Sequence, residues 1–154
     1  MRARRLLAVV ALVLLAAPAR AHDWNTKDIS WLGLEDALVH AKKTRKPVCL
    51  IVYTEWCPHC GNYSKLFHDG KVVEKSKKFV MVHLDQDKEK PHAAKYRPDG
   101  GGYIPRTVFL RPDGTIAEDI KAPNPQFPYF YPENDAAPLL TAMDAALAKL
   151  AAKK

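Results

Sequence analysis

The sequence contains only three cysteines, no apolar run long enough to cross a membrane, and little net charge beyond its first residues. An odd number of cysteines cannot all pair within the chain, and 154 residues can bury a core without disulfide staples. The longest run of Leu, Val and Ala, residues 6–17, has twelve residues, whereas a membrane-spanning helix needs roughly 20. We therefore expect neither a disulfide framework nor a permanent membrane anchor.

The formal charge of +7 is concentrated at the amino terminus. Four arginines and no acid lie in the first 21 residues, which leaves 20 Lys and Arg against 17 Asp and Glu in residues 22–154, a formal charge of +3. Such a small excess does not indicate a protein that binds nucleic acid. The chain also lacks internal repeats and linker-like segments, so its length predicts a single domain.

The first 21 residues have the organisation of an export signal. A basic start that includes Arg4 and Arg5 is followed by the apolar run 6–17 and by the small-residue site Ala19-Arg20-Ala21. We expect a signal peptide over residues 1–21, cleaved near Ala21, and export to a bacterial periplasm or to the exterior. The mature chain would be one domain, residues 22–154, in a compartment where neighbouring cysteines can form disulfides.

Hydrophobic periodicity predicts an alternation of helices and strands. Continuous apolar runs typical of buried strands lie at 47–53, 79–84 and 104–110. Helical patterns lie at 34–45, 58–68, 72–77, 91–96 and 136–151. A turn at 111–114 would return a hairpin strand at 115–120. This order predicts an α/β fold in which a central mixed sheet carries helices on both faces.

Two cysteines stand where the first strand meets the next helix, in the sequence Trp56-Cys57-Pro58-His59-Cys60. If the helix begins at Pro58, Cys57 is its N-cap, where unpaired N–H groups and the helix dipole favour a thiolate. A free thiol has a pKa of about 8.5, and such surroundings lower it to roughly 3.5–7.5. Cys60 lies on the same helical face, within reach of a disulfide. Cys57 is therefore predicted to attack and Cys60 to resolve the mixed disulfide.

The third cysteine, Cys49, lies in the middle of the apolar run 47–53 and is predicted to be a core residue rather than a redox partner. A structural zinc site is disfavoured because the usual second cysteine pair is absent. We expect no bound metal and no cofactor besides the redox-active disulfide of Cys57 and Cys60. A metal carrier that uses this pair and a histidine stays an alternative of another class.

The order of elements, the Cys-x-x-Cys pair, and Ile104-Pro105, 45 residues after Cys60, together resemble the thioredoxin superfamily. The resemblance implies a thioredoxin-like fold in which Pro105 is cis and lies beside the cysteines. Thioredoxins carry a buried acid six residues before the first active cysteine, where this chain has Ile51. Glu55 or water is expected to assist proton transfer from Cys60 instead.

A closer resemblance lies in the runs 96–106 and 109–114, which contain Pro-Asp-Gly, Ile-Pro-Arg and a second Pro-Asp-Gly. They resemble the small single-domain thioredoxin-like proteins of the endoplasmic reticulum, the anterior-gradient group. That resemblance implies thiol–disulfide exchange with client proteins in a secretory compartment. The last residues, 150–154, contain no retrieval signal, so we expect an exported bacterial relative instead of a retained one.

The dipeptide Pro58-His59 matches that of the periplasmic oxidase DsbA rather than the Gly-Pro of thioredoxins. His59 would stabilise the thiolate of Cys57, and this predicts an intermediate to oxidising potential. The sequence therefore favours a disulfide oxidase or isomerase. The alternative is a periplasmic thiol reductase fed by a membrane electron donor, which acts in cytochrome or metal-site maturation.

The apolar residues Trp56, Ile104 and Pro105 are expected to form a rim around Cys57 for client binding. Backbone beside a cis-proline can pair with an extended peptide as a short added strand. We expect a monomer whose partners are client proteins with thiols or disulfides and a membrane redox protein, and not nucleic acid.

Overall fold

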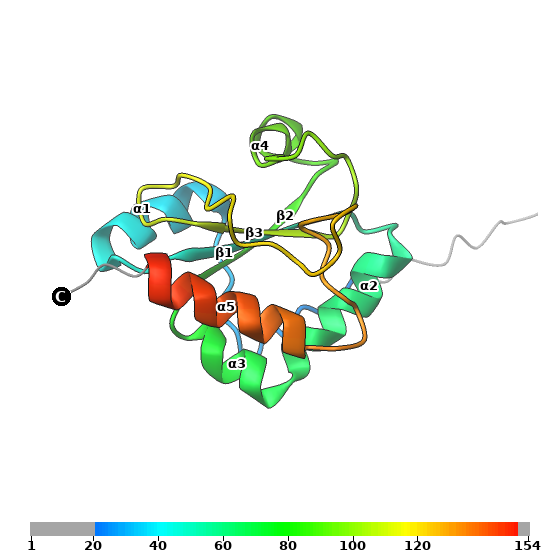
Figure 1. Ribbon diagram of the computed structural model, residues 1–154, viewed down its shortest axis with the longest axis horizontal. Helices are drawn as coiled ribbons and strands as arrows, with labels where there is room; N and C mark the ends of the chain where they lie inside the picture. Colours follow the sequence, from blue (N-terminus) through cyan, green and yellow to red (C-terminus); the bar gives the residue numbers. More distant parts are fainter. Residues whose placement is uncertain (1–20, 151–154) are drawn as a thin grey trace, which may run out of the picture.

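The computed structural model describes residues 21–150, so the expected signal peptide lies outside the described residues except for Ala21. Its helices are α1 (Leu34–Thr44), α2 (Pro58–Ser64), a 3-10 turn η1 (Lys65–His68), α3 (Gly70–Ser76), α4 (Lys90–Lys95) and α5 (Ala137–Leu150). Its strands are β1 (Val48–Tyr53), β2 (Val80–Asp85) and β3 (Arg106–Leu110). The predicted alternation of helices and strands is therefore present (Figure 1).

The three strands form a mixed sheet in the order β2-β1-β3. Strand β1 runs parallel to β2, with Ile51 opposite His83, and antiparallel to β3, with Ile51 opposite Thr107. Every residue of β1 is buried, as expected for a continuous apolar strand at the centre of a sheet. The carboxyl end of β1 leads directly into a short loop that ends at Cys57, and α2, which contains Cys60, follows at once.

The predicted hairpin strand at 115–120 was wrong, since only Ile116 forms a bridge, to Leu110. The turn is present, and Gly114 adopts a φ of +85° that favours glycine. Beyond the bridge, the N–H of Ile120 bonds to the carbonyl of Ala117 at 3.2 Å. This local turn takes the chain away from β3 before a second ladder can form.

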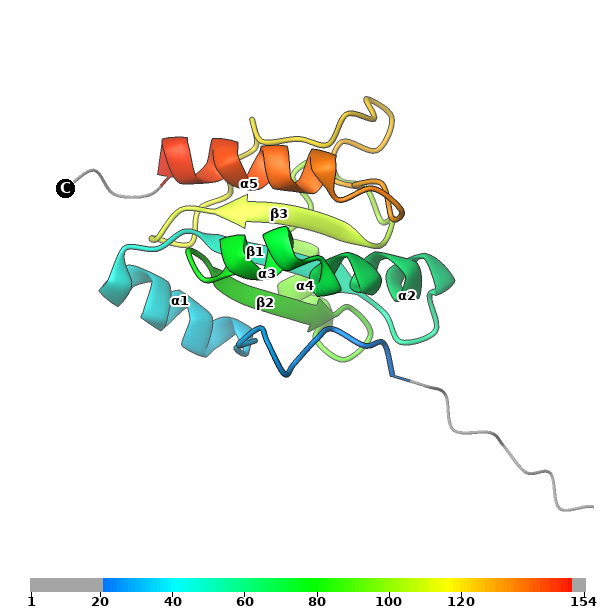
Figure 2. The ribbon, with the colours of Figure 1, turned by 90° about the horizontal axis from the view of Figure 1, so that it is seen from below.

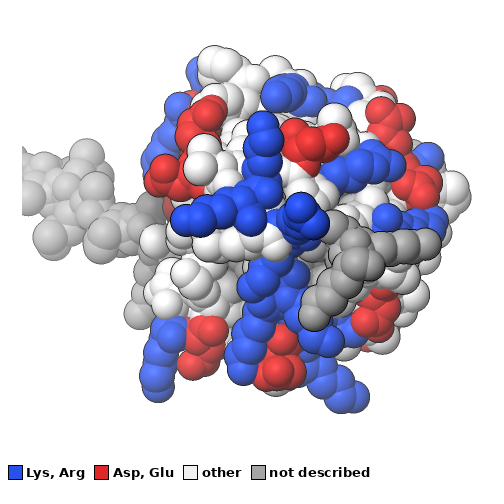
Figure 3. Space-filling view, turned by 90° about the vertical axis from the view of Figure 1, so that its left-hand side faces the viewer, with Lys and Arg blue, Asp and Glu red and all other residues white. Residues whose placement is uncertain are grey.

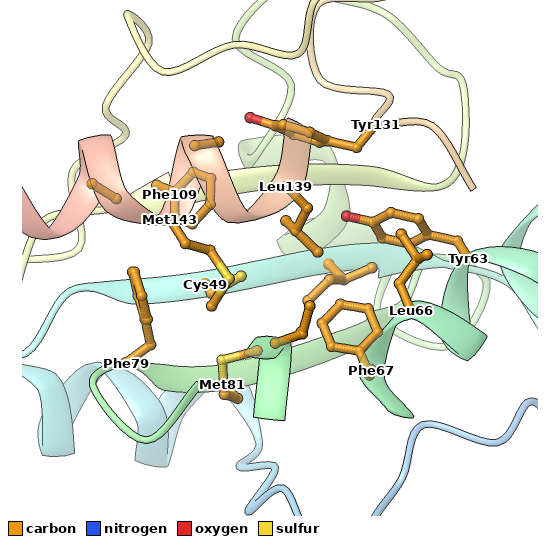
Figure 4. Packing of buried hydrophobic residues seen from close by; sticks show 14 of the residues in the cluster. Cys49, Tyr63, Leu66, Phe67, Phe79, Met81, Phe109, Tyr131, Leu139 and Met143 are labelled. Atoms are coloured by element: carbon orange, nitrogen blue, oxygen red, sulfur yellow. The ribbon is translucent and has the colours of Figure 1, made fainter. Parts of the chain in front are cut away.

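Helices cover both faces of the sheet, as predicted. The face of β1 that bears Val48 and Leu50 packs against residues of α1 and α4. The opposite face, which bears Cys49 and Ile51, packs with α2, α3 and α5 (Figures 1 and 2). Figure 4 shows the second of these cores, with Cys49 among large apolar side chains. Cys49 has no exposed surface, and burial raises the pKa of its thiol, which confirms its prediction as a core residue.

Lys and Arg side chains gather at the end of the molecule opposite the cysteine-bearing helix α2, with Asp and Glu side chains among them (Figure 3). Helices α1, α3 and α5 each carry lysine in the last turn, at Lys43, Lys75 and Lys149. Cations at these positions stabilise the negative ends of the helix dipoles. This arrangement gives the excess of positive charge a local structural role.

Arg106 connects the start of β3 to the segment around α4. Its side chain is fully buried, and its guanidinium donates hydrogen bonds to the carbonyls of Tyr96 at 3.1 Å, Ala93 at 3.1 Å and Tyr103 at 2.9 Å. Burial lowers the pKa of Arg106 to about 10. Because these acceptors come from residues 93–103, a single side chain holds the loop that leads into Ile104 and Pro105.

Candidate active site

Cys57 is the N-cap of α2, and Pro58 is the first residue of the helix, as the sequence predicts. The N–H of Cys60 donates to Cys57 Sγ at 3.2 Å, so the sulfur itself caps one unpaired donor of the first turn. Both cysteines are free thiols in this structure. Cys60 has no exposed surface and Cys57 is 3% exposed, so an external sulfur can reach only Cys57.

Burial is the largest influence on Cys60 and raises the pKa of its thiol, and the hydrogen bond with Cys57 acts in the same direction. A hydrogen bond with the backbone of Thr54 lowers that pKa in part. The raised pKa favours the protonated thiol of Cys60, and its resolving role stays a prediction.

The second part of the site is the loop before β3. The Ile104–Pro105 peptide bond is cis. The thiol of Cys57 contacts the carbonyl oxygen of Ile104, with 3.9 Å between sulfur and oxygen. The structure thus brings Cys57 to the predicted rim residue Ile104, 47 positions away in the chain, and to the peptide bond that joins Ile104 to Pro105.

Tyr63 links the two parts of the site, the cysteine-bearing helix α2 and the strand β3 that follows Pro105. Its hydroxyl and Thr107 Oγ1 form a buried hydrogen bond of 2.8 Å, which links α2 to β3. Burial raises the pKa of Tyr63 well above its ordinary value. The helix that bears the cysteines and the strand that follows Pro105 are therefore held at a fixed separation.

His59 lies on the exposed side of α2, and its contacts are with the loop that precedes α5. Its Nδ1 is 2.9 Å from Glu133 Oε2, and the other oxygen of that carboxylate accepts from Asn62 Nδ2 at 3.2 Å. The ring of Phe130 lies edge-on at 6.0 Å. Together with Leu66 these residues line an open hollow of about 720 Å³ beside α2. The tuning of Cys57 by His59 stays a prediction.

Trp56 is 69% exposed, and its indole N–H donates to Asp87 Oδ2 at 2.7 Å. Its ring thus lies on the surface next to Cys57 in the chain, and its role in client binding stays a prediction. Glu55, the candidate for proton transfer, accepts from the hydroxyl of Tyr53 at 3.0 Å and lies 4.0 Å from Lys88 Nζ.

Ile51 is fully buried, so the position of the usual buried acid is apolar here. His83 on β2 and Thr107 on β3 lie opposite Ile51, and burial lowers the pKa of the His83 imidazole. Asp85, at the end of β2, is a buried carboxylate that pairs with Lys88 at 3.1 Å.

Sequence reasoning missed three residues that contact this site: His22, Asp87 and Glu133. Each is joined to the site by a contact across more than 30 positions of the chain. No local pattern marks them, because an isolated acid or histidine is ordinary on a surface.

Within residues 21–150, no group of three or more His, Cys, Asp or Glu side chains is arranged to hold a metal ion. Among the same residues, no helix is long and apolar enough to cross a membrane.

A mixed sheet with helices on both faces, a Cys-x-x-Cys pair at the start of α2 and the contact of Cys57 with Ile104 define a thioredoxin-like protein. Solved structures share this fold. A thioredoxin from Thermus thermophilus has a TM-score of 0.63 and 19% identity, over 79% of this chain and 89% of that chain. A DsbH oxidoreductase has a TM-score of 0.51 and 19% identity, over 70% and 78%.

Sequence comparison identifies the family. A thioredoxin-like family matches residues 30–112. The anterior gradient protein 2 homolog of Homo sapiens is 32% identical over 128 residues, 82% of this chain and 71% of that protein. Anterior gradient protein 3 of Mus musculus is 30% identical over 123 residues, 78% and 72%. The chain belongs to the thioredoxin-like family, and its predicted resemblance to the anterior-gradient group is confirmed.

Proposed function

We propose that this protein is a thiol–disulfide oxidoreductase that exchanges disulfides with client proteins through Cys57 and Cys60. The observation that carries the proposal is the position of Cys57: its sulfur caps α2, accepts the N–H of Cys60 and contacts the carbonyl of Ile104. A thiolate there lies at the positive end of a helix, and an incoming chain can reach it beside Pro105.

The exchange needs no cofactor, because the cysteine pair itself carries two electrons. When the disulfide form oxidises a client, a client thiolate attacks Cys57, a mixed disulfide forms and Cys60 leaves as a thiolate that takes up a proton. A second client thiolate then attacks the client sulfur and releases Cys57. The client loses two electrons, and a membrane redox partner would reoxidise the pair.

The direction we propose is oxidation or isomerisation. Its support is the Pro58-His59 dipeptide and the start of α2 at Pro58, both of which favour the reduced form of the pair. Export as a monomer after cleavage near Ala21 is part of the same proposal. Its support is the organisation of residues 1–21 and the similarity to the anterior gradient proteins.

The test of mechanism is disulfide formation in a reduced, unfolded substrate protein, measured with residues 22–154 and three cysteine variants. Cys57→Ala should lose activity at least about a hundredfold, and Cys60→Ala should trap mixed disulfides that are visible on non-reducing gels. Cys49→Ala is the matched control and should retain activity. Full activity in Cys57→Ala would disprove the assigned mechanism.

The test of direction is a titration of the Cys57–Cys60 pair against glutathione. Thioredoxin and DsbA differ by about 150 mV, equivalent to ~7 kcal/mol, so the two directions are well separated. We expect a potential above about −230 mV. A value near −270 mV, that of thioredoxin, would favour the thiol reductase instead.

A further inference from the structure

The amino-terminal end of the described chain lies against the loop that carries the cysteine pair. Figures 1 and 2 both place the start of the coloured chain near the loop that joins β1 to α2. There the backbone nitrogen of His22 is 3.4 Å from Glu55 Oε2, and its ring Nε2 is 2.9 Å from the carbonyl oxygen of Thr54. The same carbonyl accepts the N–H of Cys57 at 3.3 Å. His22 therefore contacts both Thr54 and Glu55, the two residues that precede Trp56.

The fit of the His22 ring depends on the absence of a side chain at Gly61. A Cβ at that position would lie 3.0 Å from His22 Nδ1 and 3.2 Å from Cε1. Since a carbonyl oxygen only accepts, Nε2 carries the hydrogen of the bond to Thr54. Gly61 directly follows Cys60, so the ring lies between the loop before Cys57 and the helical turn that bears Cys60.

Residue 22 is also the first residue of the mature chain if the signal is cleaved after Ala21. Cleavage would convert the backbone nitrogen of His22 from an amide into a free amino group. An α-amino group has an ordinary pKa of about 7.7–8.0, so it is largely an ammonium at neutral pH. The atom that approaches Glu55 would then carry a positive charge.

We propose that signal cleavage completes the redox site by placing the α-ammonium of His22 on the carboxylate of Glu55. The inference rests on the proposed function, including cleavage after Ala21. Glu55 stands two residues before Cys57, and its negative charge disfavours a thiolate there. An ammonium on Glu55 offsets that charge, which stabilises the reduced, thiolate form of the pair. His22 is thus a positioning and electrostatic residue, and the exported form is a stronger oxidant than the uncleaved chain.

The experiment compares the chain that starts at His22 with one that retains Ala21 and carries an acetyl group on its α-amino nitrogen, both released from a cleavable fusion that leaves no other residue. The equilibrium with glutathione is measured for each by mass spectrometry of the trapped thiols. The equilibrium constant for reduction should be about two- to fivefold larger for the chain that starts at His22, the size that a partly exposed ion pair supports. Glu55→Gln is made in both chains and should abolish the difference.

The difference should also disappear at pH 10, where the α-amino group is neutral. Other titratable groups around His22 belong to both chains, so their effects cancel in the comparison: Asp23, Tyr53, Glu55, Cys60, His68, His83, Asp85 and Lys88. Equal constants at pH 7 would overturn the proposal. A difference that persists at pH 10 or with Glu55→Gln would show a steric effect of Ala21 and would also overturn it.

A second pair of variants tests whether the position of the His22 ring against Gly61 matters. Gly61→Ala should displace the His22 ring and lower the equilibrium constant toward that of the chain with Ala21. Gly70→Ala is the matched control, since it is also a helical glycine and a Cβ there meets nothing within 4 Å. An unchanged constant in Gly61→Ala would count against the proposal. Failure of the proposed function is distinct, because then neither chain would exchange disulfides at all.

Discussion

The buried hydrogen bond between Tyr63 and Thr107 offers a quantitative test of how the two parts of the site are held together. Tyr63→Phe leaves Thr107 Oγ1 without its partner, and Thr107→Val leaves the Tyr63 hydroxyl without its own. Both replacements preserve shape, and valine suits a strand. An unpaired buried polar group costs about 1–3 kcal/mol, so each single variant should lose free energy of unfolding in this range.

The double variant should lose less than the sum, because it removes both polar groups together. We expect a coupling free energy of about 1–2 kcal/mol. Urea unfolding of the reduced proteins measures it. At ordinary slopes of about 1–3 kcal/mol per M, a loss of about 1–3 kcal/mol in a single variant lowers the midpoint by roughly 0.3–3 M.

The matched control is Tyr131→Phe. Tyr131 is in the same core, and its buried hydroxyl has no hydrogen-bond partner among residues 21–150. Its removal should leave stability unchanged or raise it, because nothing is left unpaired. Additive losses in the Tyr63 and Thr107 cycle, within about 0.3–0.5 kcal/mol, would refute the reasoning that this bond joins α2 to β3.

Three further predictions follow from other contacts. Cys49→Ala should lower the free energy of unfolding by about 0.5–1.5 kcal/mol, the range for deleting one buried group. Cys49 of the native protein should resist alkylation, because burial raises the pKa of its thiol. Rapid alkylation before unfolding would contradict this. Arg106→Lys should lower the free energy of unfolding by about 2–4 kcal/mol, because an ammonium cannot replace the guanidinium hydrogen bonds to three carbonyls. Thermal or urea unfolding measures the change, and a variant as stable as the wild type would contradict this prediction. Burial lowers the pKa of His83, so its contribution to stability is complete above pH 6.5 and is lost as the pH falls below that value, with a slope of at most about 1.4 kcal/mol per pH unit. His83→Leu should show a shallower loss of stability between pH 6.5 and 5, and an unchanged pH dependence would refute the assignment.

The parts of the site that the sequence predicts are those encoded over a few residues. The run from Val48 to Tyr53 is apolar throughout, which indicates a strand covered on both faces, and Pro58 marks a helix start immediately after Cys57. A sulfur at an N-cap and a second sulfur one turn later follow from helix geometry alone. The fold class and the cysteine pair could therefore be predicted without a structure.

The contacts that surround the pair could not be predicted, because they join distant segments. His59 could be identified as a neighbour of Cys57, but its pairing with Glu133 spans 74 positions. The prediction of a hairpin strand at 115–120 was wrong for a related reason. The hydrogen bond from the N–H of Ile120 to the carbonyl of Ala117 depends on packing, and no glycine, proline or asparagine in the sequence marks this turn. Local patterns identify the cysteine pair and its neighbours in the chain, whereas tertiary packing brings His22, Asp87 and Glu133 to them.

Both outer strands of the sheet are closed by single-residue bridges rather than by full strands. Trp31 bridges to Met81 on the outer side of β2, and Ile116 bridges to Leu110 beside β3. The N–H of Thr107 is taken by the carbonyl of Tyr129 at 2.8 Å. Under the proposed function, this protein would meet unfolded chains, whose segments can add to an open sheet edge and nucleate aggregates. These short covers occupy backbone groups on both edges, so we expect a client chain to pair beside Pro105 rather than along an outer strand.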